Sequence, residues 1–475
     1  MKKLNSILIF LIITLGATLR LYRLDAPLAD WHSWRQTDTA SVAREYVKKG
    51  INLMHPTYHD LSSIPSGLDN PNGYRFVEFP IISALHASLA KSYPQLNLVE
   101  WGRLLSVISS TLSIGLIYLI MKTVSGNLAA TVAALVYATL PYNIFYGRVI
   151  LPEPHLVLFM LAALYSFIRY YDTGKIISLI FYTITMTLAV LMKPTALVVG
   201  VPIALYSLFG SKVNLKRLGV VAAVSAVSVM PYALWRSYVA SYPAGIPANA
   251  WLFNGNAIRF KGAWLRWLFG DRIGRLILGY WGMIPLGFGL LALGSKKSET
   301  TIVGGLALAS LLYMTVIATG NVQHDYYQIQ IIPSLAMLIG VGVSYVYTLR
   351  KTLLSKITLT FLLVPCYLIA LALGWYEVRG YFNINNPAIV AAGERIDAIT
   401  NADAKVIAPY MGDTAFLFQT NRTGWPIGGD IELKIKSGAS YYVTTTRDAE
   451  YQELINKKYT LVEETDAYSI IKLTD

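Results

Sequence analysis

The sequence predicts a polytopic α-helical membrane protein followed by a small α/β domain. Hydrophobic residues make up 55% of the 475 residues and charged residues only 14%, which is more apolar surface than a soluble domain buries. Apolar runs repeatedly reach the roughly 20 residues that cross a hydrocarbon core. A soluble composition returns only after Tyr376. We therefore expect a transmembrane domain over residues 1–376 and a separate domain over 377–475.

Hydropathy predicts about eleven transmembrane helices in the first domain. The expected spans are 4–20, 104–121, 127–146, 152–170, 176–192, 195–210, 218–236, 275–293, 302–319, 328–349 and 357–376. The first span begins like a signal peptide but runs into Arg20 without a small-residue cleavage pattern. We expect it to remain as an uncleaved anchor.

Short-loop charge predicts the orientation, because Lys and Arg are retained on the cytoplasmic side. One set of loops, with the N-terminus, carries Lys2, Lys3, Lys122, Arg169, Lys175, Lys212, Lys216, Arg217, Lys296, Lys297, Arg350, Lys351 and Lys356. The opposite short loops carry only Arg148 and Lys193. The N-terminus is then cytoplasmic, and segment 20–103 and the C-terminal domain are extracytoplasmic. Topology explains much of the net charge of +13, so it does not indicate a nucleic-acid partner.

The segment 20–103, the first outer loop, is unusually rich in ionisable and aromatic residues. It carries Asp30 to Asp38 and the stretch Glu78-Phe79-Pro80. An amphipathic stretch from Phe79 to Tyr93 is expected to form an interfacial helix along the outer leaflet, with Glu78 facing either a cavity or solvent. A pore or a passive anchor has little use for such a segment, so it indicates an active site at a membrane surface.

The C-terminal domain alternates helical and strand patterns. We expect helices over 387–400 and 448–457, strands over 405–408 and 441–445, and a closing strand pair over 459–462 and 468–473. Residues 421–425 are interpreted as its most polar loop, and Asn421 heads a glycosylation sequon. The single cysteine, Cys366, lies in an apolar run and is expected to serve packing.

Ionisable residues near the outer ends of several spans form the candidate site. They are Asp30, Arg35, Asp38, Arg148, Glu153, Lys193, His324 and Asp325. Charged groups at membrane depth are costly, so their convergence on one leaflet predicts a shared cavity. For any single residue, a snorkelling or interface-anchoring role is an equal alternative. No His, Cys and carboxylate spacing indicates zinc.

The order of these motifs resembles a known superfamily. The stretches that carry the resemblance are Asp30 to Tyr46, Glu78-Phe79-Pro80, Arg148 to His155, Lys193 to Leu197 and His324-Asp325-Tyr326-Tyr327-Gln328. Together they resemble the GT-C integral-membrane glycosyltransferases, and within them the branch of protein O-mannosyltransferases and lipid A aminoarabinose transferase. The resemblance covers almost all of residues 1–376.

This resemblance implies an inverting transfer of a sugar from a polyprenyl-phosphate donor to a lipid, glycan or protein acceptor. The reaction would take place at the outer face of a plasma (inner) membrane, without a nucleotide sugar. The closer branch implies no metal cofactor. A divalent cation held by Asp30, Asp38 and Glu153 remains open, because oligosaccharyltransferases of the superfamily use one.

The resemblance also implies a first-loop carboxylate as general base. The Asp-Glu pair of the family would fall on Arg35 and Gln36, which are not acidic. We therefore favour Asp38, with Asp30 second. The alternative for Asp38 is the N-cap of a helix over 39–49. Glu153 would be a second acidic residue that orients the base or acceptor, or would simply begin a helix.

Cations are needed to stabilise the leaving phosphate. The candidates are Arg148, Lys193 and His324, with Arg35 or Arg75 in addition. Residues expected to line the acceptor site or cavity are Glu78, His32, His155, Asp325, Tyr326 and Tyr327, although the two tyrosines fit an aromatic belt better than sugar stacking.

Two other classes of protein fit the sequence less well. A flippase or transporter calls for ionisable groups near the midplane and related halves, which the sequence does not show. A membrane-anchored binding protein acting through 387–475 would leave Arg148, Glu153, Lys193 and His324 unexplained.

Overall fold

The computed structural model describes residues 2–211, 213–350 and 352–474. Lys212 and Lys351, two of the cations counted for the orientation, lie outside these residues. The chain forms two compact units. The helical unit comprises 1–24, 104–235 and 249–379, and the sheet unit comprises 25–103, 236–248 and 380–475.

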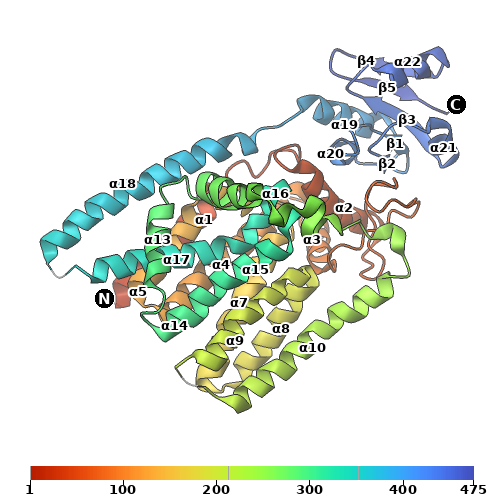
Figure 1. The fold of residues 1–475 in the computed structure, drawn as a ribbon. Coiled ribbons are helices and arrows are strands. Elements are labelled where there is room, and N and C mark those ends of the chain that lie inside the picture. The colour runs from red at the N-terminus through yellow and green to blue at the C-terminus, as the bar shows by residue number, and fades with distance from the viewer. Residues whose placement is uncertain (1, 212, 351, 475) are drawn as a thin grey trace. The chain divides into compact units, whose positions relative to one another are not determined.

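Long apolar helices dominate the helical unit (Figure 1). In the described part of the chain, seven helices are long and apolar enough to cross a membrane, and four shorter apolar helices accompany them. Every predicted span overlaps one of these helices, which confirms the predicted polytopic helical class. Their bounds are α1 (Lys2–Arg20), α4 (Leu98–Val124), α5 (Asn127–Thr139), α7 (Glu153–Thr173), α8 (Ile176–Met192), α9 (Gly200–Phe209), α10 (Leu215–Val239), α13 (Met283–Ala292), α15 (Gly305–Val316), α17 (Ile332–Thr348) and α18 (Leu353–Val378).

Shorter helical segments connect or extend these helices. They are α6 (Pro141–Tyr146), η1 (Pro194–Val199), α11 (Trp251–Asn254), η3 (Gly255–Phe260), α12 (Gly262–Leu265), η4 (Arg266–Ile277), α14 (Lys297–Glu299), η5 (Thr300–Gly304), α16 (Ala318–Gln323) and η6 (Asp325–Ile331).

The predicted span 127–146 is interrupted where α5 ends and α6 begins. Leu140 has φ −56° and ψ 120° because a residue before proline avoids the helical region. The interruption leaves carbonyls at the end of α5 without helical partners. The buried Arg20 guanidinium satisfies two of them, donating to Ala138 O at 2.9 Å and to Tyr137 O at 3.1 Å. The last residue of α1 therefore caps α5.

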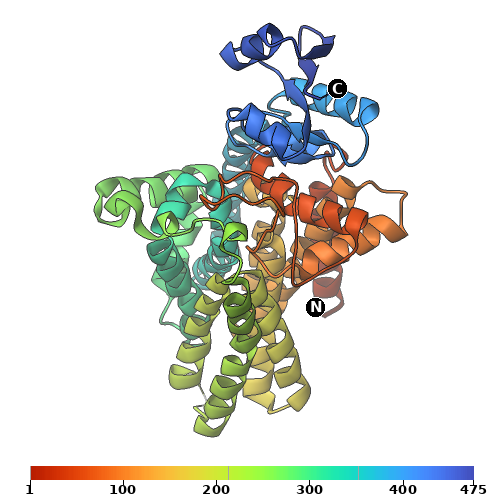
Figure 2. The ribbon, with the colours of Figure 1, turned by 90° about the vertical axis from the view of Figure 1, so that its right-hand side faces the viewer.

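Small residues let the helices of this unit approach closely. A Cβ atom on Gly289 of α13 would lie 2.1 Å from the Leu338 carbonyl oxygen of α17. A Cβ atom on Gly340 of α17 would lie 2.5 Å from the Ala129 carbonyl oxygen of α5. Elsewhere α7 packs on α8 and α15 packs on α9, and Figures 1 and 2 show α7, α8 and α9 side by side.

The sheet unit contains a five-stranded sheet of order β2-β1-β3-β5-β4. Its strands are β1 (Lys405–Ile407), β2 (Thr423–Trp425), β3 (Ala439–Thr444), β4 (Thr460–Glu464) and β5 (Ser469–Lys472). β1 pairs in parallel with β2 and β3, whereas β5 pairs antiparallel with β3 and β4. Its helices are α19 (Pro387–Ile399), α20 (Ala415–Gln419), α21 (Ile431–Lys436) and α22 (Ala449–Asn456). The predicted helices, the two strands and the closing pair are confirmed.

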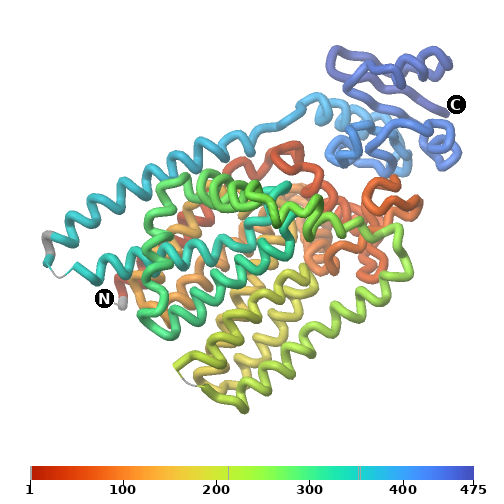
Figure 3. Tube along the Cα trace, in the orientation of Figure 1, coloured from red at the N-terminus to blue at the C-terminus, as the bar shows by residue number. Residues whose placement is uncertain are grey.

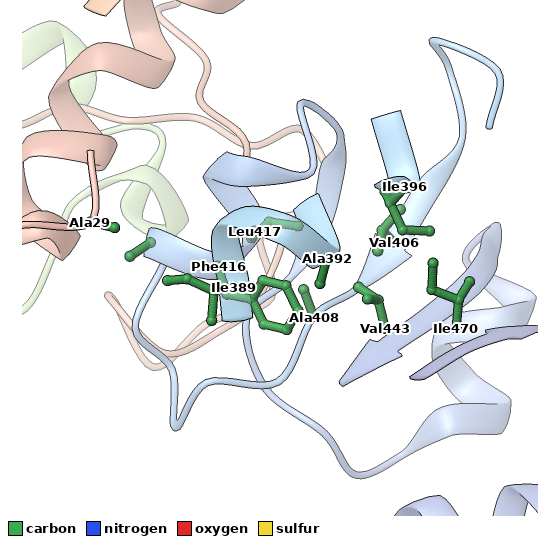
Figure 4. Close-up of a cluster of buried hydrophobic side chains, with 11 residues drawn as sticks. Ala29, Ile389, Ala392, Ile396, Val406, Ala408, Phe416, Leu417, Val443 and Ile470 are labelled. Atoms are coloured by element: carbon green, nitrogen blue, oxygen red, sulfur yellow. The ribbon is translucent and has the colours of Figure 1, made fainter. Parts of the chain in front are cut away.

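The core of this unit lies between α19 and the sheet. Figure 4 shows Ile396 of α19 near Val406, Val443 and Ile470 of β1, β3 and β5, and Ile389 of the same helix beside Phe416. Each of these side chains is at most 2% exposed. Apolar residues recur at helical spacing in α19 and occupy alternate positions in the strands, and together they produce such a core.

The interpretation of residues 421–425 as a polar loop is wrong, because Thr423–Trp425 forms strand β2. The polar sequence hides the strand, since its stability comes from pairing with β1 and with residues 59–61. Gly424 N–H donates to His59 O at 2.9 Å, and Leu61 N–H donates to Gly424 O at 2.8 Å. A Cβ atom on Gly424 would lie 1.8 Å from the Val406 carbonyl oxygen, so only glycine fits here.

Most of the first outer loop belongs to the sheet unit. It contains helices α2 (Ser33–Lys49) and α3 (Ile81–Ser92), which pack against each other. The connection between them is irregular over residues 50–80, as the trace in Figure 3 shows. The helix expected over 79–93 is present as α3. The predicted transmembrane domain over 1–376 includes this loop, and the domain boundary at 376 stays a prediction.

Candidate active site

Asp38, the favoured general base, lies inside α2 rather than at its start. The helix begins at Ser33, and its N-cap residue, His32, has a left-handed conformation with φ 52°. The Arg35 N–H donates to His32 O at 3.2 Å, which closes the first turn ahead of Asp38. The alternative that Asp38 caps a helix beginning at Thr39 is therefore wrong.

Both carboxylate oxygens of Asp38 have partners. Oδ2 lies 2.7 Å from Arg75 Nη2, and the side chains of both residues are only 7% exposed. Oδ1 accepts a hydrogen bond from the Thr414 hydroxyl at 2.8 Å. The Arg75 guanidinium also lies over the Tyr58 ring, 4.7 Å from its centroid. Charge-assisted hydrogen bonds in such a desolvated place hold the carboxylate in one orientation.

Two further carboxylates interact electrostatically with Asp38. Burial raises the pKa of Asp60 to about 7, and the Asp38 charge raises it too, although hydrogen bonds from Ser62 and Tyr58 lower it. Burial likewise raises the pKa of Asp413 to about 6, with Asp38 adding to the shift and His32 opposing it. The sheet unit thus gathers three acidic side chains, two of which hold protons more tightly than usual.

Asp60→Asn is expected to flatten the dependence of stability on pH. The folded-state pKa of Asp60, about 7, lies above the ordinary value of 3.8, so the folded state binds the proton more tightly than the unfolded state. Stability from this group is therefore greatest below about pH 4 and is lost as the pH rises toward 7. At about 1.4 kcal/mol per pKa unit, the loss amounts to roughly 4 kcal/mol at most.

Thermal unfolding of the purified protein at pH 5 and pH 8 checks this expectation. The difference between the two melting temperatures should shrink in Asp60→Asn and stay at the wild-type value in Asp69→Asn, whose side chain is exposed. An unchanged difference in Asp60→Asn would contradict the proposed burial cost.

Arg35 and Glu78 form a second buried ion pair. Arg35 Nη2 lies 3.1 Å from Glu78 Oε2, with the side chains 6% and 13% exposed. Arg35 Nη1 also donates to Thr39 Oγ1 at 2.9 Å. Glu78 therefore faces Arg35 and is largely removed from solvent, which argues against the orientation toward solvent. A cavity beside Glu78 stays a prediction.

Asp30, the second candidate base, is completely buried. It lies 3.1 Å from Arg103 Nη2 and accepts a hydrogen bond from Gln36 Nε2 at 2.8 Å. Its backbone oxygen accepts a further bond from Asn385 Nδ2 at 3.1 Å. These contacts tie the start of α2 to residues 103 and 385, so Asp30 holds the unit together and is less accessible than Asp38.

In the helical unit, Glu153 and Lys193 form an ion pair between Oε1 and Nζ. Glu153 begins α7, and Lys193 follows α8 in an extended conformation, where Pro194 ends the helix. The second oxygen of Glu153, Oε2, is buried and has no hydrogen-bond partner within the described residues. The pair thus combines a cation with a carboxylate oxygen that can still accept a proton or a hydroxyl group.

Aromatic rings cover Lys193. Its Nζ lies 5.2 Å from the Tyr327 ring centroid and 5.9 Å from that of Tyr326. The two tyrosines stack with centroids 4.7 Å apart, and His324 lies against Tyr326 at 5.5 Å. Tyr326 is only 3% exposed, which does not fit an aromatic belt at a membrane surface.

The other predicted residues of this unit, Arg148, Asp325 and His155, are buried and each makes a hydrogen bond to another segment of the unit. Arg148 Nη1 donates to Arg23 O at 3.0 Å. Asp325 Oδ1 accepts from the Tyr146 hydroxyl at 2.6 Å. His155 Nδ1 lies 2.8 Å from Ser109 Oγ.

The carboxylates considered for a divalent cation are each paired with a positive side chain: Asp30 with Arg103, Asp38 with Arg75 and Glu153 with Lys193. Across residues 2–211, 213–350 and 352–474, no three His, Cys, Asp or Glu side chains gather as metal ligands. The absence of a metal cofactor stays a prediction.

The predicted residues form two sets. The structure brings Asp38 together with Arg75, and Arg35 with Glu78, in the sheet unit, and Glu153 with Lys193, Tyr326, Tyr327 and His324 in the helical unit. A cavity shared by both sets stays a prediction. Arg103, Asp60, Asp413 and Thr414 were not predicted from the sequence, because none belongs to a motif.

The chain is similar to known proteins in part of its sequence and in its fold. Residues 97–235 match the family described as dolichyl-phosphate-mannose-protein mannosyltransferase. No curated protein sequence matches the chain significantly.

Several solved structures resemble the chain over most of its length. ArnT from Cupriavidus metallidurans, bound to undecaprenyl phosphate, matches 98% of this chain and 97% of its own with a TM-score of 0.68 and 12% identity. The Archaeoglobus fulgidus oligosaccharyltransferase in complex with zinc and sulfate matches 93% of this chain and 68% of its own, with a TM-score of 0.62 and 12% identity. The oligosaccharyltransferase AglB from Archaeoglobus fulgidus, in complex with an inhibitory peptide and a dolichol-phosphate, matches 94% of this chain and 70% of its own, with a TM-score of 0.60 and 13% identity. These likenesses show a shared fold.

Proposed function

Since this chain has the fold of the GT-C integral-membrane glycosyltransferases, we propose that it transfers a sugar from a polyprenyl-phosphate-linked donor to an acceptor. The observation that carries the proposal is the buried carboxylate of Asp38 in the first outer loop, which is held by Arg75 of the same loop and by Thr414 of the C-terminal segment. The match to a mannosyltransferase family over 97–235 and the similarity to structures that hold undecaprenyl phosphate or a dolichol-phosphate support it.

The proposed reaction is a single inverting displacement. An acceptor hydroxyl oxygen forms a bond to the anomeric carbon of the sugar, while the bond from that carbon to the carrier phosphate breaks and its electron pair leaves with the phosphate. Asp38 accepts the hydroxyl proton as general base. Its fixed orientation supports this role, because a general base must lie within hydrogen-bond reach of the proton it removes.

Lys193 is our candidate for the donor phosphate. It is a compact cation with three N–H donors, and Glu153 holds it in place at the end of α8. A phosphate dianion that approaches Lys193 would share the cation with the Glu153 carboxylate or would displace that carboxylate from it. Arg148 is buried against backbone, which makes it the weaker candidate.

An apolar cavity in the helical unit suits the isoprenoid part of such a donor. It has a volume of about 160 Å³ and is lined by residues of α5, α13, α17 and α18, among them Leu135, Pro285, Ile339 and Leu363. Ligand pockets for apolar groups are built from such side chains. The buried Cys366 also lines it.

The proposal includes the topology derived from loop charge. The N-terminus would be cytoplasmic, and the first outer loop and the C-terminal domain extracytoplasmic, in a plasma (inner) membrane. The acceptor would be a lipid, a glycan or a protein. No metal takes part in the proposed reaction, since side chains serve as base and as phosphate ligand.

Sugar release from a panel of polyprenyl-phosphate sugars tests the function. With purified protein in detergent, one donor should raise the melting temperature and should release its sugar to water or an added acceptor, with EDTA present. A well-folded sample that neither binds nor cleaves any donor would contradict the proposal and favour a flippase or a nucleotide-sugar donor.

A further inference from the structure

The loop between β1 and α20 is held in one conformation next to the candidate base. Tyr410 N–H and Gly412 N–H both donate to Pro426 O, at 2.9 Å and 3.0 Å. Met411 and Gly412 have φ values of 53° and 82°, and left-handed geometry at a residue such as Met411 costs energy and is common at functional sites. The loop thus presents the next two residues, Asp413 and Thr414, from a rigid turn.

Thr414 joins this loop directly to the candidate base. Its hydroxyl lies 2.8 Å from Asp38 Oδ1, 3.2 Å from Trp34 O and 3.2 Å from Thr37 Oγ1. A hydroxyl group has one proton to donate, and a carboxylate is a stronger acceptor than a carbonyl or another hydroxyl. The buried Thr414 hydroxyl therefore has Asp38 as its preferred acceptor.

The two partners of Asp38 constrain it from different parts of the chain. Arg75, in the first outer loop, holds Oδ2, and Thr414, in the C-terminal segment, holds Oδ1. With only one of these contacts the carboxylate would be free to rotate about its terminal torsion, which has a broad energy minimum. With both, one lone pair on each oxygen is used and the plane of the group is set.

We propose that Thr414 is a positioning residue for Asp38, so that the C-terminal segment is part of the catalytic machinery rather than only a cover for the site. This inference rests on the proposed function, in which Asp38 is the general base. Thr414 does not touch the reacting atoms. It directs the carboxylate toward the acceptor hydroxyl, and a misplacement of such a group by about 1 Å can reduce turnover about 100-fold.

Thr414→Val and Thr414→Ser test the inference with a donor that the wild-type protein turns over. Val keeps the volume but removes the hydroxyl, so we expect kcat to fall about 10- to 100-fold with little change in the KM of the donor. Ser retains the hydroxyl and should restore most of kcat. Thr444→Val is the matched control, because Thr444 is also buried and its hydroxyl bonds to Thr446 rather than to Asp38; its kcat should stay near that of wild type.

Each outcome decides the matter. Wild-type kcat in Thr414→Val would overturn the positioning role while leaving the proposed function intact. Equal losses in Thr414→Val and Thr414→Ser would show a structural role only, as would a loss in Thr444→Val of the same size. Absence of turnover by the wild-type protein on every donor would overturn the proposed function, and this inference with it.

Discussion

Asp38→Asn is expected to lower sugar transfer by about 10²- to 10⁴-fold, the usual contribution of a general base. Asn keeps an oxygen for the Thr414 hydroxyl but cannot accept the proton of the acceptor. The substitution also leaves the Arg75 charge without its anionic partner, which is costly in a buried place. Because Arg75 still lies over the Tyr58 ring, we expect a protein that folds with a lower melting temperature.

Two companion variants separate loss of the base from loss of stability. Asp38→Asn with Arg75→Gln removes both charges and should recover stability while remaining inactive. Asp403→Asn, at an exposed position, should behave as wild type. Initial rates per folded molecule are the measurement, with folding checked by thermal unfolding. Retained turnover in Asp38→Asn would move the base to Asp30 or Glu153.

Asp30→Asn should affect stability more than turnover, whereas Asp38→Asn should affect turnover more than stability. The carboxylate pairs with the buried Arg103 and with Gln36, so its loss should reduce stability more than turnover per folded molecule. An inactive but stable Asp30→Asn would exchange the roles of the two residues.

Lys193→Gln is expected to have the second large effect, on both donor binding and stability. It removes the cation proposed for the phosphate and leaves the Glu153 carboxylate buried without its ion-pair partner. Breaking a buried pair in this way costs about 3–5 kcal/mol. We expect a strong fall in melting temperature, a donor KM raised at least about 10-fold and a reduced kcat, since phosphate stabilisation matters most as the bond breaks.

Removing both charges distinguishes the structural role of the pair from its function. Lys193→Gln with Glu153→Gln should restore much of the lost stability, because two neutral amides replace the pair, yet transfer should remain impaired. The measurements are the melting temperature and the concentration dependence of sugar release. A double variant with a wild-type donor KM would remove Lys193 from the phosphate site.

Local sequence was sufficient for the helical elements. The apolar runs predicted every long helix of the helical unit, because the requirement to satisfy backbone groups in lipid makes a helix of such a run. The exception at Leu140 also has a local cause, the following Pro141, which splits one predicted span into α5 and α6. In the C-terminal domain, alternation predicted β3 but not β2, whose three residues are held by pairing with distant strands.

The candidate site was predicted only in part. Asp38, Glu153 and Lys193 were identified as ionisable residues at helix ends and through the order of motifs. Their partners were not, since ion pairs and hydrogen bonds join residues without a fixed spacing. Thr414 lies 376 positions from Asp38, and nothing in its neighbourhood marks it as part of a site.

The sequence by itself determined the membrane class of this protein, the positions of its long helices and the types of side chain available for chemistry, because hydrophobicity and helical periodicity act over neighbouring residues. Only the tertiary structure decided that Asp38 lies within α2, that Arg75 and Thr414 hold its two oxygens and that Glu153 neutralises Lys193. These facts depend on which distant segments come together, and burial then makes each charge require a specific partner.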